Sequence, residues 1–282
     1  NDAGDAYPGS PFSQGTGGGG AGSASAGIST NSGWYASQGG DGVDNLYQTN
    51  SNRGYAAGGG AYGYSVQSIG GGTSNATKSS GDSGNSPPTD YSQGKAASGG
   101  GGAGNGGGGP APMPTQVGGA GGSGIVAIRY KIANLSGTAK ASGGAISYYN
   151  SKVIHTFLYS GTFVCPGSFS ETCEYAVIGG GGGSCAGGGG AGGLMVGSMP
   201  ISGPQTVTMT VGAGGNGTRW DVESNVTQGV ASSINQPAAP DVSAPGGGKG
   251  GWGGPQGAPA LNGGAGGSGG GAGKHNDAKS GG

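Results

Sequence analysis

The sequence has few charged side chains and no long apolar run. Only 8% of its residues are Asp, Glu, Lys or Arg, and the formal net charge is −1. A nucleic-acid-binding surface needs clustered Lys and Arg, which the sequence does not supply. No stretch approaches the roughly 18 consecutive apolar residues of a membrane-spanning helix. We therefore expect no nucleic-acid partner and no membrane span.

Recognisable catalytic motifs are missing as well. The two histidines are His155 and His275, and neither stands in a motif with a Ser or Cys nucleophile. The 12 acidic residues are scattered without an evident acid–base pair, and the glycine runs lack the Lys and Ser/Thr of a phosphate loop. We expect a protein that is not an enzyme and has no catalytic residues, metal ligands or cofactor. His155 is expected to be a satisfied histidine within a strand.

Glycine, by contrast, is abundant: it supplies 79 of the 282 residues, and glycine and proline together supply 94. This composition is typical of disordered chains, but disorder also favours a high net charge, which is missing here. Ile, Leu, Val and Phe number 33, and 20 of these lie between residues 121 and 211. The distribution predicts a glycine-rich arm over 1–120, a β-strand core over 121–211 and a C-terminal glycine-rich arm over 212–282.

Neither arm has a helical period, so both are expected to be extended or looped. Glycine can make slack linkers, or it can let polyproline-II-like segments stack with their backbones in contact, as at the collagen axis. Collagen itself is excluded because no Gly-X-Y repeat occurs. A long slack arm beside a small core is unusual. We therefore favour ordered, stacked segments, including 17–20, 99–109 and 179–193, with slack linker as the alternative.

Seven segments of the core have the apolar content and alternation of β-strands. They are 125–132, 145–149, 153–159, 162–165, 173–178, 194–199 and 205–211. The sequence therefore predicts an all-β fold, a small β-sandwich with long glycine-rich extended (polyproline-II-like) and loop segments. Segments 162–165 and 173–178 are expected to be the two sides of one hairpin.

The three cysteines allow one intrachain bridge. Cys165 and Cys173 would face each other across the expected hairpin, which predicts a disulfide; two free buried thiols are the alternative. Cys185 is left over in a glycine run, and is expected to be either free or bonded to another chain. A bridge would indicate an oxidising, extracellular setting.

Two further motifs are weak. Residues 39–47 match the calcium-binding nonapeptide G-G-x-G-x-D-x-U-x. That site takes its ligands from stacked repeats, and the sequence holds one copy, so no metal site is expected. Four Asn-x-Ser/Thr sequons occur, at Asn75, Asn134, Asn216 and Asn225, which is close to the number expected by chance.

Four stretches between residues 118 and 217 are more specific. They read GGAGGSGIVAIRYKI (118–132), SKVIHTFLYSGTF (151–163), CEYAVIGGGGGSCAGGGGAGGLMVGSM (173–199) and QTVTMTVGAGGNG (205–217). This pattern resembles the glycine-rich domain found in phage tail fibres and in some bacterial surface proteins. The resemblance is close over roughly 118–217 and compositional elsewhere.

The order of the motifs departs from that family. There the GGSGIV-type strand closes the domain, whereas here it lies at 118–130, before the other strands. Residues 1–133 thus resemble the end of one domain and residues 140–282 the beginning of the next. The resemblance implies a circular permutation, a window from a tandem array, or a subunit whose C-terminal arm receives its closing strand from a neighbour.

Three functions are compatible with these features. The first is a non-catalytic structural subunit of an extracellular or virion fibre or filament, built from copies of itself by strand or arm exchange. The second, implied by the resemblance, is a phage tail-fibre adhesin that recognises a host surface glycan or protein. Its candidate recognition aromatics are Trp34, Tyr35, Tyr47, Tyr62 and Tyr64, with packing onto the arm as their alternative role. The third is ice binding through the row Thr206, Thr208 and Thr210.

Overall fold

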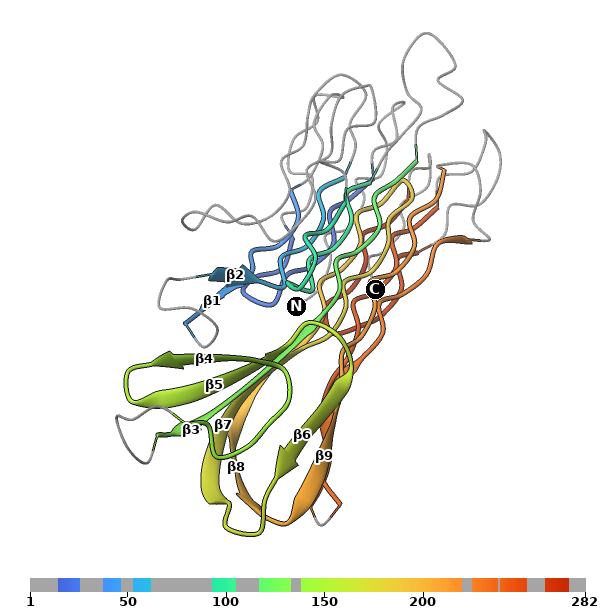
Figure 1. Ribbon diagram of the computed structural model, residues 1–282. Helices are drawn as coiled ribbons and strands as arrows, with labels where there is room; N and C mark the ends of the chain where they lie inside the picture. The colour runs from blue at the N-terminus through green and yellow to red at the C-terminus, as the bar shows by residue number, and fades with distance from the viewer. Residues whose placement is uncertain are drawn as a thin grey trace, which may run out of the picture.

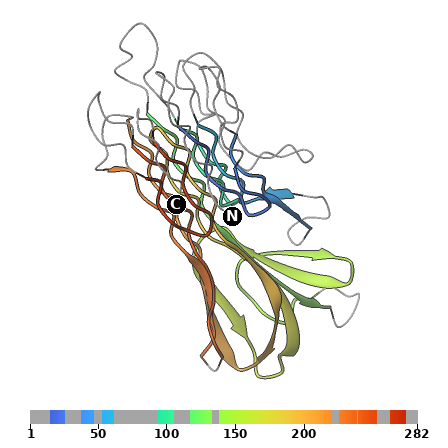
Figure 2. The same cartoon turned by 180° about the vertical axis from the view of Figure 1, so that it is seen from behind.

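The computed structural model describes residues 15–25, 38–46, 53–61, 93–104, 117–132, 138–219, 225–237, 239–252 and 262–273. These residues form a β-sandwich joined end-on to a bundle of extended, glycine-rich segments, which we call the glycine lattice (Figures 1 and 2). No described helix is long and apolar enough to cross a membrane. The predicted all-β fold, with a small sandwich and extended glycine-rich segments, is confirmed.

Two antiparallel sheets make the sandwich. The five-stranded sheet has the order β4-β5-β3-β7-β8, and the four-stranded sheet has the order β11-β10-β9-β6. Their strands are β3 (Ile125–Lys131), β4 (Ala145–Tyr149), β5 (Lys152–Phe157), β6 (Gly161–Cys165), β7 (Ser170–Ile178), β8 (Leu194–Ser202), β9 (Gln205–Thr210), β10 (Ser232–Asn235) and β11 (Val242–Ala244). A separate two-stranded ribbon consists of β1 (Val43–Asn45) and β2 (Arg53–Tyr55).

The core between the sheets is built by strand alternation. In β9, Val207 and Met209 are fully buried, whereas Thr206 and Thr208, which alternate with them, are exposed. Aromatic rings fill the centre: Phe169 meets Tyr130 edge-on, with ring centroids 5.1 Å apart, and Phe163 edge-on at 5.8 Å. Such edge-to-face pairs stabilise a core beyond the area that they bury.

All seven predicted strands are present, as β3 to β9, with small shifts at their ends. The predicted hairpin between β6 and β7 is wrong, because β6 pairs with β9 while β7 pairs with β3 and β8. The connection between them crosses from one sheet to the other, and its Phe169 is buried in the core between the sheets. Strands β10 and β11 were not predicted.

The glycine lattice is held together by backbone hydrogen bonds with a three-residue period. Along residues 179–185 the amides donate in rotation to three different neighbours, which are 187–193, 227–230 and 119–122. Only a chain with three residues per turn directs every third amide to the same side, and this is the geometry of polyproline II. The carbonyl groups of the same residues accept from three more segments, containing Gly102, residues 215–218 and residues 247–250. Residues 179–185 therefore have six hydrogen-bonded neighbours.

A second interior segment, 187–193, is surrounded in the same way. Its amides donate to residues 245–251, 16–19 and 99–102, and its carbonyls accept from three further segments, which contain Gly59, Gly182 and residues 268–271. Segments from both predicted arms thus lie beside the central glycine run. All amides and most carbonyls of these two segments thus exchange water for a partner in a neighbouring segment, as buried backbone groups require.

The interior glycines of the lattice have no room for a side chain, although Ser184, Cys185 and Ala191 are accommodated at other buried positions of the same segments. A Cβ atom on Gly182 would overlap the carbonyl oxygen of Gly248, and one on Gly101 would overlap that of Gly189. Close contact between backbones thus explains the glycine runs. The expectation of ordered, stacked arms is confirmed for residues 17–20, 99–104 and 179–193, whereas residues 105–109 lie outside the described part of the chain.

The sandwich and the lattice are continuous, because six strands run directly into lattice segments (Figure 1). The β7–β8 ladder, for example, continues through the bond from the Gly179 amide to the Gly193 carbonyl oxygen. β3 lies between β5 and β7 of its own chain. The strand that the filament hypothesis exchanges between neighbouring subunits is therefore part of this chain's own sheet. The described glycine segments after Val211 likewise pack against their own chain.

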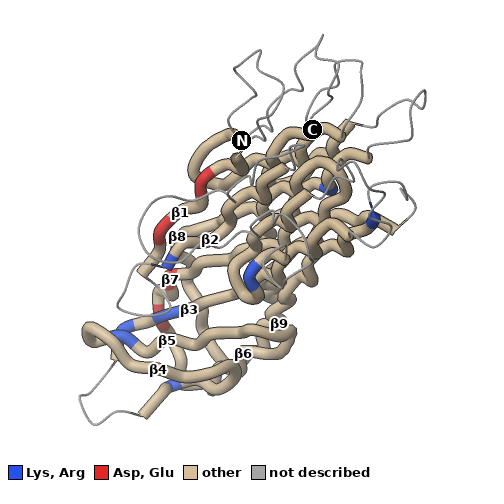
Figure 3. The backbone as a smooth tube through the Cα atoms, turned by 90° about the horizontal axis from the view of Figure 1, so that it is seen from above, with Lys and Arg blue, Asp and Glu red and all other residues tan. Residues whose placement is uncertain are grey.

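Charged residues are sparse along the described part of the chain (Figure 3). The main cluster lies on the five-stranded sheet, where the Glu174 carboxylate accepts hydrogen bonds from Arg129 and from Lys152, both at 2.5 Å. These bonds, first of all the one from Lys152, lower the pKa of Glu174.

Candidate recognition surface

One side of the glycine lattice carries outward-pointing side chains in a regular pattern. Four adjacent segments form it, 93–97, 117–123, 212–219 and 225–230. Because polyproline II repeats every three residues, every third side chain points the same way. In segment 212–219, this exposes Ala213 and Asn216 while Gly215 and Thr218 are buried. The result is a face on which small apolar and uncharged polar side chains are joined by two charged residues of these segments, the exposed Lys95 and the partly exposed Arg219.

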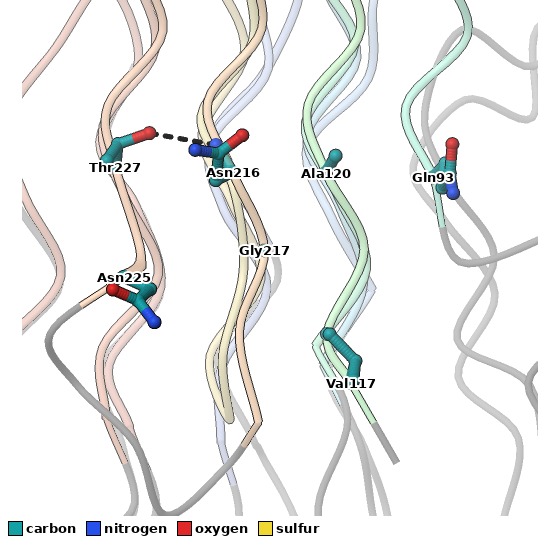
Figure 4. A pocket seen from close by; sticks show the side chains of 8 residues that line it. Gln93, Val117, Ala120, Asn216, Gly217, Asn225 and Thr227 are labelled. Carbon is teal, nitrogen blue, oxygen red and sulfur yellow. Dashed lines mark hydrogen bonds between the residues drawn. The ribbon is translucent and has the colours of Figure 1, made fainter. Parts of the chain in front are cut away.

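An open depression of about 580 Å³ lies on this face (Figure 4). Its lining residues are Gln93, Val117, Gly118, Ala120, Asn216, Gly217, Asn225 and Thr227. Figure 4 shows Thr227, Asn216, Ala120 and Gln93 in one row across the four segments. Residues that are 134 positions apart in the sequence, Gln93 and Thr227, thus line the same depression.

Two hydrogen bonds hold part of this row in place. The backbone N–H of Asn216 donates to the side-chain Oγ1 of Thr227 at 2.8 Å, and the backbone N–H of Thr227 donates to the backbone carbonyl oxygen of Asn216 at 3.2 Å. The side-chain amides of Gln93, Asn216 and Asn225 make no hydrogen bond within the described structure, so each has a donor and an acceptor available.

The lining contains no acid, base or thiol, which limits its chemistry. Amide and hydroxyl groups can hydrogen-bond a neutral polar ligand, and Val117 and Ala120 offer apolar contact. They cannot activate a nucleophile or transfer a proton at neutral pH. The geometry therefore suits binding of an uncharged, hydroxyl-bearing molecule.

His155 is the buried strand histidine that the sequence predicts. Its Nδ1 lies 2.6 Å from the Gly143 carbonyl oxygen, so Nδ1 carries the proton and donates it. Nε2 then accepts from the Tyr130 hydroxyl at 3.3 Å, and that hydroxyl accepts from the backbone amides of Lys140 and Ala141. Burial lowers the pKa of His155, and the bond to Gly143 partly opposes this shift. The pair fixes the 138–144 connection and does not touch the depression.

The predicted disulfide is not formed in the structure, in which Cys165 and Cys173 are free thiols within the core. They belong to strands of different sheets, which removes the hairpin argument for pairing them. Burial raises the pKa of Cys165 to about 11 and that of Cys173 to about 12. Cys185, which we expected to be either free or bonded to another chain, is a fully buried thiol whose Sγ lies 3.1 Å from the Arg219 carbonyl oxygen.

The two aspartates of the nonapeptide match lie in different elements. Asp41 lies in a lattice segment and Asp44 in β1 of the two-stranded ribbon, so they do not lie between stacked sequence repeats. No group of three or more metal-ligating side chains occurs in the part of the chain that the structure describes.

A family model for a glycine-rich domain matches residues 158–282. No curated protein and no solved structure matches the chain. The matched region begins directly after β5 and includes β6 to β11 with the lattice segments that follow them, whereas β3 and the segments before it lie outside the match. The depression is therefore shared: Asn216, Asn225 and Thr227 come from the matched region, while Gln93, Val117 and Ala120 precede it.

The five candidate recognition aromatics, Trp34, Tyr35, Tyr47, Tyr62 and Tyr64, all lie outside the described residues. Two of the four sequons, Asn216 and Asn225, line the depression, and Asn75 and Asn134 lie outside the described residues. Sequence reasoning missed the depression as a site. The available signal was the three-residue spacing of the side chains at 213, 216 and 219 within a glycine run.

Proposed function

We propose that this chain is a non-catalytic recognition module of an extracellular or virion fibre that binds a neutral, hydroxyl-rich host-surface ligand such as a glycan. The observation that carries this proposal is the uncharged depression, which presents three unengaged side-chain amides on a rigid backbone lattice. A rigid site loses little conformational entropy on binding, which favours affinity from few contacts.

The position of β3 favours a self-contained module over a filament made by strand exchange. A strand-exchange filament needs a sheet with a vacant place, and in this chain β3 already fills the place between β5 and β7. The reordered motifs are then explained by circular permutation. A module at the tip of a fibre needs no vacant place.

The resemblance to the glycine-rich domain of phage tail fibres supports an adhesin of that type. The family match supports the glycine-rich domain over residues 158–282 and does not point to phages in particular. The assignment to a phage tail fibre thus rests on the quoted motifs between residues 118 and 217.

A binding assay with paired variants tests this proposal. The purified protein is applied to arrays of neutral glycans and to intact bacterial cells, and the Asn216→Ala, Asn225→Ala double variant is compared with Asn235→Ala on β10. A neutral hydrogen bond contributes about 0.5–1.5 kcal/mol, so loss of two should weaken binding about fivefold or more. Equal binding by both variants would exclude the depression, and open polymers of the native protein in electron micrographs would restore the filament hypothesis.

Ice binding remains a second candidate because the threonine row extends into a sheet face. Thr208 of β9 is paired with Thr162 of β6 and Thr206 with the exposed Val164, and β10 and β11 add Ser233 and Ser243 to this uncharged surface. Thermal hysteresis of the protein solution measures this activity directly. It should fall in a Thr208→Lys variant, and its absence in the unmodified protein would reject the candidate.

A further inference from the structure

Strand β4 is an open edge of the five-stranded sheet. It pairs with β5 only, and all five of its residues are exposed. Its large side chains retain much of their accessible surface, at 42% for Ile146, 50% for Tyr148 and 41% for Tyr149. Ile146 and Tyr148 are paired with His155 and Val153 of β5, whose side chains are buried in the core. Ile146 and Tyr148 therefore lie on the core-facing side of the sheet, but beyond its buried part.

The turn at the end of β4 determines which of its backbone groups face outward. Asn150 and Ser151 have φ angles of 46° and 58° and form a two-residue turn between the paired residues Tyr149 and Lys152. The pair flanking such a turn exchanges hydrogen bonds, and backbone groups alternate in direction along the strand. The N–H and C=O groups of Ile146 and Tyr148 therefore point to the open edge, where the described structure provides no partner for them.

Features that block edge pairing are absent from β4 but present on other edges. Edge strands usually carry a charge, a proline or a bulge, or they are very short or covered. β8 contains Pro200, β11 has three residues, and β6 is partly covered by the bridge between Val164 and Ser142. β4 has the sequence Ala-Ile-Ser-Tyr-Tyr, with none of these features.

We propose that β4 pairs antiparallel with β4 of a second copy of this chain, in a register centred on Ser147. In this register Ile146 of each copy faces Tyr148 of the other, and their outward backbone groups form two doubly bonded pairs. Each Ile–Tyr pair also places a β-branched side chain beside an aromatic ring, a favourable cross-strand combination. The result is a two-fold symmetric dimer with a continuous ten-stranded sheet.

A second copy suits this edge because the strand is complementary to itself. Its uncharged residues pose no like-charge repulsion across the symmetry axis. Lys152 and Lys140 are each engaged in an ion pair of their own chain, with Glu174 and Glu171 respectively. A charged partner strand would find no counter-charge along β4.

Cysteine cross-linking tests the register. Ser147 would face Ser147 of the second copy as a non-hydrogen-bonded pair, with Cα atoms about 4.5 Å apart, which is within the range of a disulfide. The Ser147→Cys variant should therefore form a disulfide-linked dimer under mild oxidation, whereas Ser198→Cys, on the exposed face of β8, should stay monomeric. The three native cysteines are buried and give no background reaction in the folded protein.

Sedimentation of unmodified and variant protein over a concentration series tests the surface. Ile146→Pro removes one outward donor and leaves the β4–β5 ladder intact, so it should abolish the dimer. Ser147→Lys should do the same by like-charge repulsion, while Thr208→Lys, on another strand, should leave the dimer unchanged. The proposal is overturned by monomeric unmodified protein without Ser147→Cys cross-linking, or by a dimer that persists in both β4 variants.

Discussion

Gly189 and Gly182 approach each other so closely across the glycine hairpin that a Cβ atom on Gly189 would overlap the carbonyl oxygen of Gly182. Both residues belong to interior segments with neighbours on all sides. At these two positions the lattice therefore has no space for an added methyl group. This makes the glycine content a packing requirement that single substitutions can test.

The first prediction is that Gly189→Ala destabilises the protein while Gly167→Ala does not. Overpacking typically costs about 1–3 kcal/mol, and here backbone on both sides resists movement. At Gly167 the nearest atom to an added Cβ is Pro204 Cδ at 3.9 Å, an ordinary contact. Urea unfolding midpoints of the two variants measure the difference. Equal midpoints would mean that the interior of the lattice is loose.

The second prediction is that all three cysteines are free, and are unreactive in the native state. Burial raises the pKa values of Cys165 and Cys173, so little thiolate is present near neutral pH. A thiol reagent at about pH 8 should label the native protein slowly and label three thiols quickly after unfolding. Mass spectrometry of a non-reduced digest provides the check. A Cys165–Cys173 peptide pair would restore the disulfide.

The same two thiols predict a loss of stability at alkaline pH. Their folded pKa values, about 11 and about 12, lie above the ordinary value of 9.0, so the unfolded chain releases these protons first. Stability is thus fully present below about pH 9 and decreases as the pH rises toward 11–12. Substituting both cysteines by alanine should flatten this decrease. An unchanged alkaline slope in the double variant would assign it to other groups, such as Tyr130, whose pKa burial also raises.

The fourth prediction concerns His155 under mildly acidic conditions. Burial lowers its pKa below 6.5, so the unfolded chain takes up a proton that the folded chain does not. The free energy of unfolding should therefore hold above about pH 6.5 and decrease as the pH falls below it. A His155→Gln variant should be less stable at all pH values but show a smaller decrease between about pH 7.5 and 5.5. Parallel pH profiles for the two proteins would contradict the assignment.

The strands of the sandwich could be predicted because their alternation is local. Val207 and Met209 against Thr206 and Thr208 determine which face of β9 is buried, whatever its partners are. The pairing of strands is not local. The predicted hairpin between β6 and β7 does not form because the connection that contains the buried Phe169 crosses from one sheet to the other. β10 and β11 escaped prediction because each is short and buries only one apolar side chain, Ile234 or Ala244, in the core.

The order of the glycine-rich segments could be predicted from the sequence, but not which segments are neighbours in the lattice. Glycine content indicates close backbone contact, yet the partners of residues 187–193 lie as far away in the sequence as residues 16–19 and 268–271. Nothing in a run of identical residues identifies its neighbours. The depression was missed for the same reason, because Gln93 and Thr227 meet only through the order of the intervening segments.

The last prediction is that hydrogen exchange follows the three-residue period of the lattice. In the interior segments 179–185 and 187–193 every amide donates to another backbone carbonyl, so all of them should exchange slowly. Segment 117–124 lies at the edge: its bonded amides are Gly118, Gly119, Gly121, Gly122 and Gly124, whereas Ala120 and Ser123 have no bonded acceptor. Residue-resolved exchange should therefore show uniform protection in the interior segments, but fast exchange at Ala120 and Ser123 between protected neighbours. Uniformly fast exchange would restore the slack-linker alternative, and uniform protection at the edge would mean that another surface covers this face.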